Sequence, residues 1–474
     1  MKIIAFIGFF VVWSVYLHAQ KNLEQSLNNF QKEMSLTNAQ WSLYVQNAEN
    51  GKVIFEKDSQ KTMQVASCQK LFTTAVALEE LGKDFTFQTQ LAYQGNIEKN
   101  TLKGNLIIVG GGDPTLAGRN WLGKSKMNEV FAFWEKALIS KNIKKIEGKI
   151  IGNASYFPEK DLPKGWSSKD IGNYYASDAY GLNFNDNLYE LYLKPAKNVG
   201  LEAVISHTSP KIPFLNFKGN ITTAEAFTGD NAYISGLPMQ NERFLSGTIP
   251  LGNIFIIKGA LPNPPYTAAY LLHNQLVSRG LAITDKPDFS YEKPSEQLVV
   301  ITEISSPKLA TIIKEVNFFS INLYAEALWK QIGKKNNKSS FELIKEFCQK
   351  KNITTEQMIL EDGSGLSSEN RISTQELGQL LGAMHSSESF SVFYESLPVA
   401  ANSGTLRSWG KKTPLANNLR AKTGSMQGVI ALAGYMRNAK GEKIIVAFAV
   451  NAYQGTYSNI RKKMEQVLLA IYRN

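Results

Sequence analysis

Apolar residues recur at helical spacing in three stretches of this chain. The first lies within residues 66–82, a run that closes on a glycine, and its stripe consists of Leu71, Ala75 and Leu78. Residues 318–329 carry apolar side chains at helical and near-helical spacing and predict a second helix. A third predicted helix lies near the C-terminus and packs on a sheet through Ile460, Met464, Val467, Leu468 and Ile471.

Strand patterns surround these helices. Residues 41–46 and 52–56 predict a hairpin across the turn Asn50-Gly51. Three β-rich runs near the C-terminus predict consecutive antiparallel strands, at residues 419–425, 429–435 and 444–450. Further strand-like runs lie between the first two predicted helices, at residues 106–109, 188–193 and 253–257.

The N-terminus reads as an export signal. A single cation, Lys2, precedes an apolar run over residues 3–17, which is short for a membrane span. We expect cleavage after residue 19, and an uncleaved anchor is the alternative. No later segment is apolar enough to cross a membrane.

The composition limits the number of domains and the kinds of partner and cofactor that the chain can have. The 474 residues suffice for more than one domain, and the formal charge of +11 falls to +10 without Lys2. Such a basic surface suits anionic cell-envelope polymers, although solvated lysine-rich loops explain it equally well. Cys68 and Cys348 are expected to be buried thiols without a disulfide between them. No metal-ligand spacing, cofactor motif or nucleic-acid module is apparent.

One Ser-x-x-Lys motif has the context of a nucleophile. Other serines also have a lysine three positions later, but proline or glycine interrupts or closely follows them. Ser67 and Lys70 instead share one helical face, so the amine can reach the hydroxyl. The first helical turn also favours developing negative charge. A neutral Lys70 would take the Ser67 proton, and this requires a pKa below the usual ~10.4 of lysine. Solvation on a surface helix is the alternative.

Two further motifs complete a set for acyl transfer without histidine. Ser320-Ile321-Asn322 lies in the second predicted helix, where Ser320 suits a proton relay and the Asn322 amide suits a substrate backbone group. The alternative is a simple turn cap. Lys422-Thr423-Gly424 lies on a predicted strand, where the lysine and the hydroxyl suit a carboxylate. Gly424 leaves room for a substrate backbone at the strand edge. An ordinary edge strand is the alternative.

A histidine triad is excluded as the mechanism. After removal of the signal the chain has only His207, His273 and His385, and no Gly-x-Ser-x-Gly elbow surrounds any serine.

With these motifs, the chain resembles the penicillin-binding D-alanyl-D-alanine carboxypeptidase/endopeptidase family of low-molecular-mass class C, the DacB type. The likeness runs from about Trp41 to the end of the chain. It includes the segments at residues 110–116, 362–367 (Asp-Gly-Ser-Gly-Leu-Ser), 397–400 and 404–406.

The resemblance implies a role for each motif residue. Ser67 would be acylated, Lys70 would be the base, and Ser320 with Asn322 would complete the relay and hold substrate.

The third motif and the residues after it would bind the substrate. Lys422 and Thr423 would anchor its carboxylate, and the backbone N–H groups of Ser67 and Ser425 would form the oxyanion hole. Met426 would line the pocket for the substrate side chain.

Three positions depart from the family pattern. Ile321 replaces the acid of the usual Ser-Asp-Asn, and Ser368 stands where an arginine is usual. Asn153 replaces an aspartate that commonly binds the free amine of the diamino acid in the substrate. The change at Asn153 therefore puts the usual recognition of this amine in question. It does not affect the expected acyl transfer.

The long separation of the first two motifs predicts an insertion. We expect an α+β catalytic domain of the serine β-lactamase/DD-peptidase type, an antiparallel sheet covered by helices, formed by residues 20–84 and 287–474. The inserted domain would comprise residues 85–190 and 245–286, with a smaller domain nested at 191–244.

The function implied is a periplasmic serine DD-peptidase acting on the stem peptides of peptidoglycan. It would release D-Ala or cleave cross-links through an acyl-enzyme, and β-lactams would inhibit it. The alternatives are a β-lactamase or esterase on the same fold, or a non-catalytic envelope peptide-binding scaffold. Peripheral contact with the membrane through residues 461–463 is left open, and the sequence does not fix the oligomeric state.

Overall fold

The computed structural model describes residues 24–474 except 33–35, 37, 120–125 and 158–160. The expected signal, residues 1–19, lies outside the described residues. The chain forms two compact units, each described by itself. One holds the described residues up to Lys83 with Leu309–Ile321 and Ile332–Asn474; the other holds Asp84–Lys308 and Asn322–Gln331. None of the helices in the described part is long and apolar enough to cross a bilayer.

The first unit is built on a five-stranded antiparallel sheet. Its strand order is β19-β20-β21-β1-β2, with bounds Arg420–Met426, Val429–Arg437, Lys443–Asn451, Gln40–Asn47 and Val53–Lys57. Both predicted strand sets, the hairpin and the C-terminal run, are confirmed. Strand β19 is at the edge of the sheet, where its outer side has an isolated bridge between Arg420 and Val399.

Helices cover both faces of this sheet. On one face α10 (Tyr457–Arg473) contributes its predicted stripe to the main core, together with the helical segment 24–32. All five stripe residues are buried, as predicted. On the other face lies α8 (Thr374–His385), where the hydroxyl of Tyr435 donates to the carbonyl of Leu381 at 2.7 Å. The other helices of this unit are α2 (Lys70–Leu81), α5 (Leu309–Phe319), α7 (Ser340–Lys350) and α9 (Phe390–Ser396).

The prediction of one helix over residues 318–329 is wrong. Helix α5 ends at Phe319, and α6 (Asn322–Asn336) begins after a break at Ser320. Ser320 has a φ of +63°, a left-handed conformation that no α-helix accommodates. The apolar spacing continues across this break, so periodicity alone could not reveal it.

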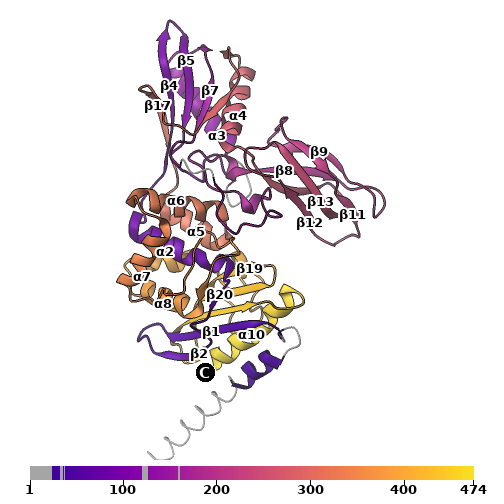
Figure 1. Cartoon of the computed structure of the whole chain (residues 1–474), viewed down its shortest axis with the longest axis vertical. Coiled ribbons are helices and arrows are strands. Elements are labelled where there is room, and N and C mark those ends of the chain that lie inside the picture. Colours follow the sequence, from indigo (N-terminus) through magenta and orange to yellow (C-terminus); the bar gives the residue numbers. More distant parts are fainter. Residues whose placement is uncertain (1–23, 33–35, 37, 120–125, 158–160) are drawn as a thin grey trace, which may run out of the picture. The chain divides into compact units, whose positions relative to one another are not determined.

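The second unit contains a seven-stranded sheet with its own core. The strands are β4 (Gln88–Glu98), β5 (Thr101–Val109), β6 (Lys145–Glu147), β7 (Ile150–Asn153), β15 (Ala282–Ile283), β16 (Asp288–Ser290) and β17 (Val299–Ser305). Helices α3 (Met127–Ser140) and α4 (Pro264–Ser278) lie beside this sheet (Figure 1) and contribute Trp134 and Leu272 to the core.

A smaller core belongs to two further sheets of this unit. Their orders are β14-β8-β9 and β10-β13-β11, with β12 paired to β13. The bounds are Leu188–Lys194 (β8), Val204–Ser209 (β9), Asn216–Gly219 (β10), Thr222–Ala224 (β11), Asn231–Ser235 (β12), Glu242–Pro250 (β13) and Phe255–Ala260 (β14).

Two predicted domain limits differ from the structure: the end of the insertion and the extent of the nested domain. The chain does not return to the catalytic unit at residue 287 but at Leu309, because β16 pairs with β7 and β17 pairs with β4. The smaller core draws on residues from Tyr189 to Leu261, so the nested domain is longer than 191–244. Strand pairing between distant segments sets these limits, and no local sequence signal marks them.

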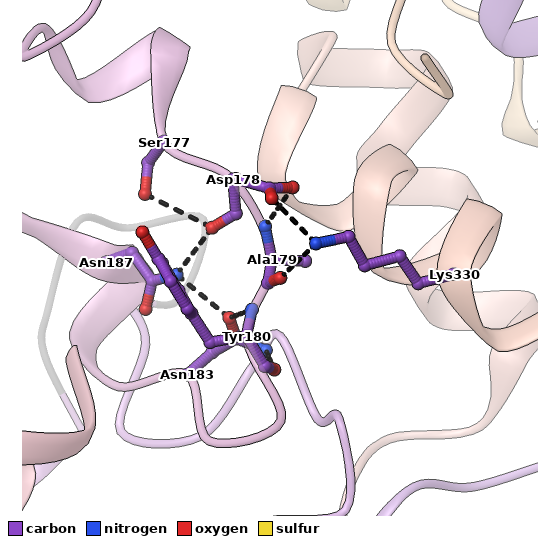
Figure 2. Close-up of polar contacts among 7 residues, drawn as sticks. All are labelled: Ser177, Asp178, Ala179, Tyr180, Asn183, Asn187 and Lys330. Atoms are coloured by element: carbon purple, nitrogen blue, oxygen red, sulfur yellow. Dashed lines mark hydrogen bonds and ion pairs between the residues drawn. The ribbon is translucent and has the colours of Figure 1, made fainter. Parts of the chain in front are cut away.

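Within the second unit, a buried ion pair holds the first part of α6. Lys330 Nζ lies 2.6 Å from Asp178 Oδ2 and donates to the carbonyl of Ala179 at 2.8 Å (Figure 2). The side chains are 13% and 3% exposed. Asn187 Nδ2 donates to the carbonyl of Asp178, and Asn187 belongs to three consecutive residues with left-handed φ. This segment therefore has a single, densely bonded conformation.

Replacing Asp178 with asparagine is expected to destabilise the second unit by about 3 kcal/mol, because it leaves the buried Lys330 cation without its counter-ion. Urea unfolding measures the change. The matched control is Asp84→Asn, which breaks an exposed pair with Lys308 and should change little. Equal effects of the two variants would contradict the structural role of the buried pair.

Candidate active site

The predicted nucleophile lies where a short 3-10 turn leads into a buried helix. Ser67 belongs to the turn Ala66–Gln69, and α2 follows directly and ends before Gly82, close to the predicted bounds. Ala66 has a φ of +45°, a sparsely populated conformation for a residue with a Cβ. Such strain concentrates at functional sites, where the surrounding structure maintains it. Here it places a half-buried hydroxyl at the start of a rigid helix.

The first motif forms the hydrogen bond that its spacing predicts. Lys70 is fully buried, and its Nζ donates to Ser67 Oγ at 2.7 Å and to the carbonyl of Ser364 at 2.6 Å. The pair therefore has the geometry and burial that a lysine base requires.

The second and third motifs form a second Ser–Lys pair in the same unit. Lys422 Nζ donates to Ser320 Oγ at 2.9 Å and to the carbonyl of Thr423 at 2.7 Å. Lys422 is fully buried, and burial lowers its pKa from 10.5 to about 8, with the Cys68 thiol acting in the opposite direction. Near neutral pH the Lys422 side chain is mainly cationic, which suits a carboxylate partner.

Strand β19 lies directly against the nucleophile turn. Cys68 Sγ donates to the carbonyl of Lys422 at 3.3 Å. Burial raises the pKa of the Cys68 thiol to about 12, against the opposing effect of the lysines at positions 422 and 70. A Cβ on Gly424 would lie 2.1 Å from the carbonyl oxygen of Val65. The close approach of the Ser67 turn therefore requires glycine at position 424. The expected reason was different, namely room for substrate at the strand edge.

Replacing Gly424 with alanine is therefore expected to separate β19 from the Ser67 turn. We expect acylation by a β-lactam to slow by about 10²-fold, because small displacements of reacting groups have effects of this size. Stopped-flow kinetics with a chromogenic β-lactam measures the rate.

The control for this variant is Gly382→Ala in α8, where an added Cβ meets nothing closer than 3.6 Å. A helical glycine replaced in this way should leave the rate unchanged and raise stability slightly. Normal acylation by Gly424→Ala would show that β19 tolerates the displacement.

The remaining residues of the third motif line the same strand. Thr423 Oγ1 donates to Thr405 Oγ1 at 2.8 Å, so its hydroxyl has a fixed orientation. Ser425 is exposed and Met426 half-buried, next to the edge of the sheet. Both side chains are accessible from solvent, as a pocket-lining role requires.

Two residues expected at the site belong to the second unit. Asn322 Nδ2 donates to the carbonyl of Tyr175 at 2.7 Å. Asn153 is 2% exposed, donates to the carbonyl of Glu292 and accepts from Ser155. Ser67, Lys70, Ser320, Lys422 and Thr423 come together within the first unit, and the hydrogen bond from Asn322 to Tyr175 lies in the second.

The three sequence motifs do not include two residues that contribute to the site. Ser364 supplies the carbonyl that accepts from Lys70, and Thr405 binds the Thr423 hydroxyl. Both belong to segments that carry the family resemblance, at 362–367 and 404–406, which was the available signal. Cys68 and Cys348 are buried thiols, as expected. No group of three or more histidine, cysteine or acidic side chains in the described part of the chain has the geometry of a metal site.

Two Ser–Lys pairs beside an edge strand have the arrangement of a serine hydrolase. Comparison with known proteins agrees with this class. The profile of the D-Ala-D-Ala carboxypeptidase 3 (S13) family matches residues 20–471, and the chain belongs to this family. The family prediction is thereby confirmed, and so is the prediction of a serine-type D-Ala-D-Ala carboxypeptidase.

Relatives cover most of the chain. The D-alanyl-D-alanine carboxypeptidase DacB of Haemophilus influenzae is 29% identical over 421 residues, which are 86% of this chain and 84% of that protein. The D-alanyl-D-alanine carboxypeptidase of Actinomadura sp. is 25% identical and covers 91% of this chain and 81% of its own.

A solved structure shows the same fold. The crystal structure of penicillin binding protein 4 (dacB) from H. influenzae aligns with a TM-score of 0.79 at 24% identity. The alignment covers 94% of this chain and 98% of that one. The predicted α+β DD-peptidase fold with extra domains is confirmed.

Proposed function

We propose that this protein hydrolyses D-Ala-terminated or cross-linked peptidoglycan peptides through an acyl-enzyme on Ser67. One observation carries the proposal: the Nζ atom of the fully buried Lys70 lies 2.7 Å from Ser67 Oγ. The related carboxypeptidases support the substrate class. Export by residues 1–19 would bring the enzyme to the periplasm, where this substrate lies.

Acylation would use the first pair. Neutral Lys70 accepts the Ser67 proton while Oγ attacks the penultimate D-Ala carbonyl, and a C–O bond forms. The N–H groups of Ser67 and Ser425 would stabilise the oxyanion that develops. Collapse of this intermediate breaks the C–N bond, and Lys70 passes the proton that it accepted through Ser320 to the leaving amine, which returns Lys70 to its neutral form.

Substrate binding and deacylation would use the second pair and the strand. Lys422 holds the terminal carboxylate, together with Thr423 once its hydroxyl turns from Thr405, and Met426 lines the side-chain pocket. After the amine leaves, neutral Lys70 takes a proton from the water that attacks the ester carbonyl, the C–O bond to Ser67 breaks, and Lys70 returns the proton to Ser67 Oγ. The same steps with a β-lactam give a stable acyl-enzyme, and one solved structure of the H. influenzae protein contains a β-lactam.

The pKa of Lys422 makes the binding step pH-dependent. Lys422 holds its proton below about pH 8 and loses it above, so the carboxylate anchor weakens as pH rises. The second-order acylation constant for a carboxylate-bearing β-lactam should fall as pH rises through about 8, because this constant reports the free enzyme. A matched β-lactam ester without the carboxylate should show no such fall. The same profile for both compounds would remove Lys422 from carboxylate binding.

The proposal is tested by digestion of purified muropeptides. Mass spectrometry should show loss of terminal D-Ala from pentapeptides, cleavage of cross-linked dimers, or both, and the products should be absent with Ser67→Ala. Penicillin labelling without any muropeptide product would favour a β-lactamase or esterase. Absence of both activities would favour a peptide-binding scaffold.

A further inference from the structure

A buried carboxylate organises the loop at residues 362–370, within the first unit. Asp362 is fully buried, and its Oδ1 accepts from the backbone N–H of Gly365 at 2.8 Å and from Asn370 Nδ2 at 2.9 Å. Gln69 Nε2 also donates to Oδ1, at 3.1 Å, and Oδ2 accepts from the N–H of Ser367 at 2.7 Å. A carboxylate with this many donors has one orientation, and the loop around it has one conformation.

The same loop packs against the first motif through its backbone. The Ser364 carbonyl accepts from Lys70 Nζ at 2.6 Å, and the Gly363 carbonyl accepts from Thr73 Oγ1 at 2.7 Å. A Cβ on Gly365 would lie 2.1 Å from the carbonyl oxygen of Ala66, and its φ is +79°. Three consecutive loop residues therefore lie directly against the turn that carries Ser67 and the helix that carries Lys70.

The Ser364 carbonyl bears on the chemistry of Lys70. A neutral amine has two N–H donors and one lone pair, and only the lone pair can accept the Ser67 proton. A hydrogen bond from one N–H to the Ser364 carbonyl limits rotation about the last C–N bond to arrangements that keep this N–H in place. In the neutral amine, one such arrangement directs the lone pair to Ser67 Oγ, which lies 2.7 Å from Nζ. The carbonyl can do this only if its loop stays in place.

We propose that Asp362 is a positioning residue for acylation, acting on Lys70 through the loop and the Ser364 carbonyl. The hydrogen bonds of Asp362 described above are with Gln69, Asn370 and the backbone of its own loop, so its effect on Lys70 is indirect. The inference rests on the proposed function and adds to it a residue outside the three motifs.

Asp362→Asn tests the inference with a change of one atom. The amide oxygen can keep the donors at Oδ1, and its NH2 then faces the N–H of Ser367, which leaves two donors opposed. Saturation kinetics with a carboxylate-bearing β-lactam separates the acylation rate constant k2 from the dissociation constant Ks. We expect k2 to fall by about 10²-fold, as for other small displacements of a reacting group. Ks should change by less than about twofold, because the carboxylate anchor at Lys422 and Thr423 is retained.

The matched control is Glu376→Gln. Glu376 is also a buried carboxylate of this unit, and its Oε2 accepts from the N–H of Ser373 at the start of α8. This variant should lower the melting temperature and leave k2 unchanged. If Asp362→Asn does not fold, Asn370→Ala removes one donor from the same carboxylate and should lower k2 in the same direction.

The outcomes separate this inference from the proposed function. A wild-type protein that no β-lactam acylates would refute the proposed function itself. Acylation of the wild type with an unchanged k2 in Asp362→Asn, or in Asn370→Ala where the first variant is unfolded, would overturn only the positioning role. Equal losses in k2 and in affinity would also overturn it, because they indicate general distortion of the site.

Discussion

Replacement of Ser67 by alanine is expected to abolish covalent labelling by fluorescent penicillin, with a loss of at least about 10⁴-fold in acylation rate. The variant removes the only hydroxyl that the buried Lys70 amine is proposed to deprotonate, and alanine fits the space that serine occupies. Gel fluorescence after incubation with fluorescent penicillin measures labelling, and circular dichroism verifies the fold.

The control for this prediction is Ser305→Ala. Ser305 also has a lysine three positions later, Lys308, but it lies on strand β17, and its hydroxyl donates to Gln88 Oε1. We expect this variant to label like the wild type. Labelling that persists in Ser67→Ala would move the nucleophile to another residue.

Replacement of Lys70 by glutamine or arginine is expected to slow acylation by about 10²- to 10⁴-fold, the usual contribution of a positioned base. Glutamine keeps a hydrogen bond to Ser67 without basicity. Arginine keeps a cation that cannot lose its proton at accessible pH. If Lys70 served only as a fixed positive charge, the arginine variant would retain activity and the glutamine variant would not. We expect both variants to lose activity, because neither side chain can accept the Ser67 proton.

Stopped-flow acylation of both variants makes this measurement. Lys52→Gln, at an exposed position of the hairpin turn, is the control and should match the wild type. An active Lys70→Arg variant would contradict the role of Lys70 as a base.

Local sequence patterns predicted much of the catalytic unit. The i, i+3 spacing of Ser67 and Lys70 follows from one turn of chain, and the structure places their side chains 2.7 Å apart. The apolar stripe of α10 and the hairpin of β1 and β2 were predictable for the same reason, because each depends on residues only a few positions apart.

Features that depend on distant segments were not predictable in this way. The break between α5 and α6 results from a left-handed φ at Ser320 inside an apolar run. The return to the catalytic unit at Leu309 depends on the pairing of β17 with β4. The carbonyl of Ser364, which binds Lys70, comes from a loop nearly 300 residues further along, as the sequence separation of 294 shows.

The central claim is that Ser67 forms the covalent intermediate, and peptide mapping by mass spectrometry after reaction with a β-lactam tests it most directly. We predict that the adduct lies on the peptide containing Ser67, that fragmentation places it on this residue, and that Lys70→Gln greatly reduces its yield. An adduct on any other side chain, or an unmodified protein after long incubation, would contradict the account.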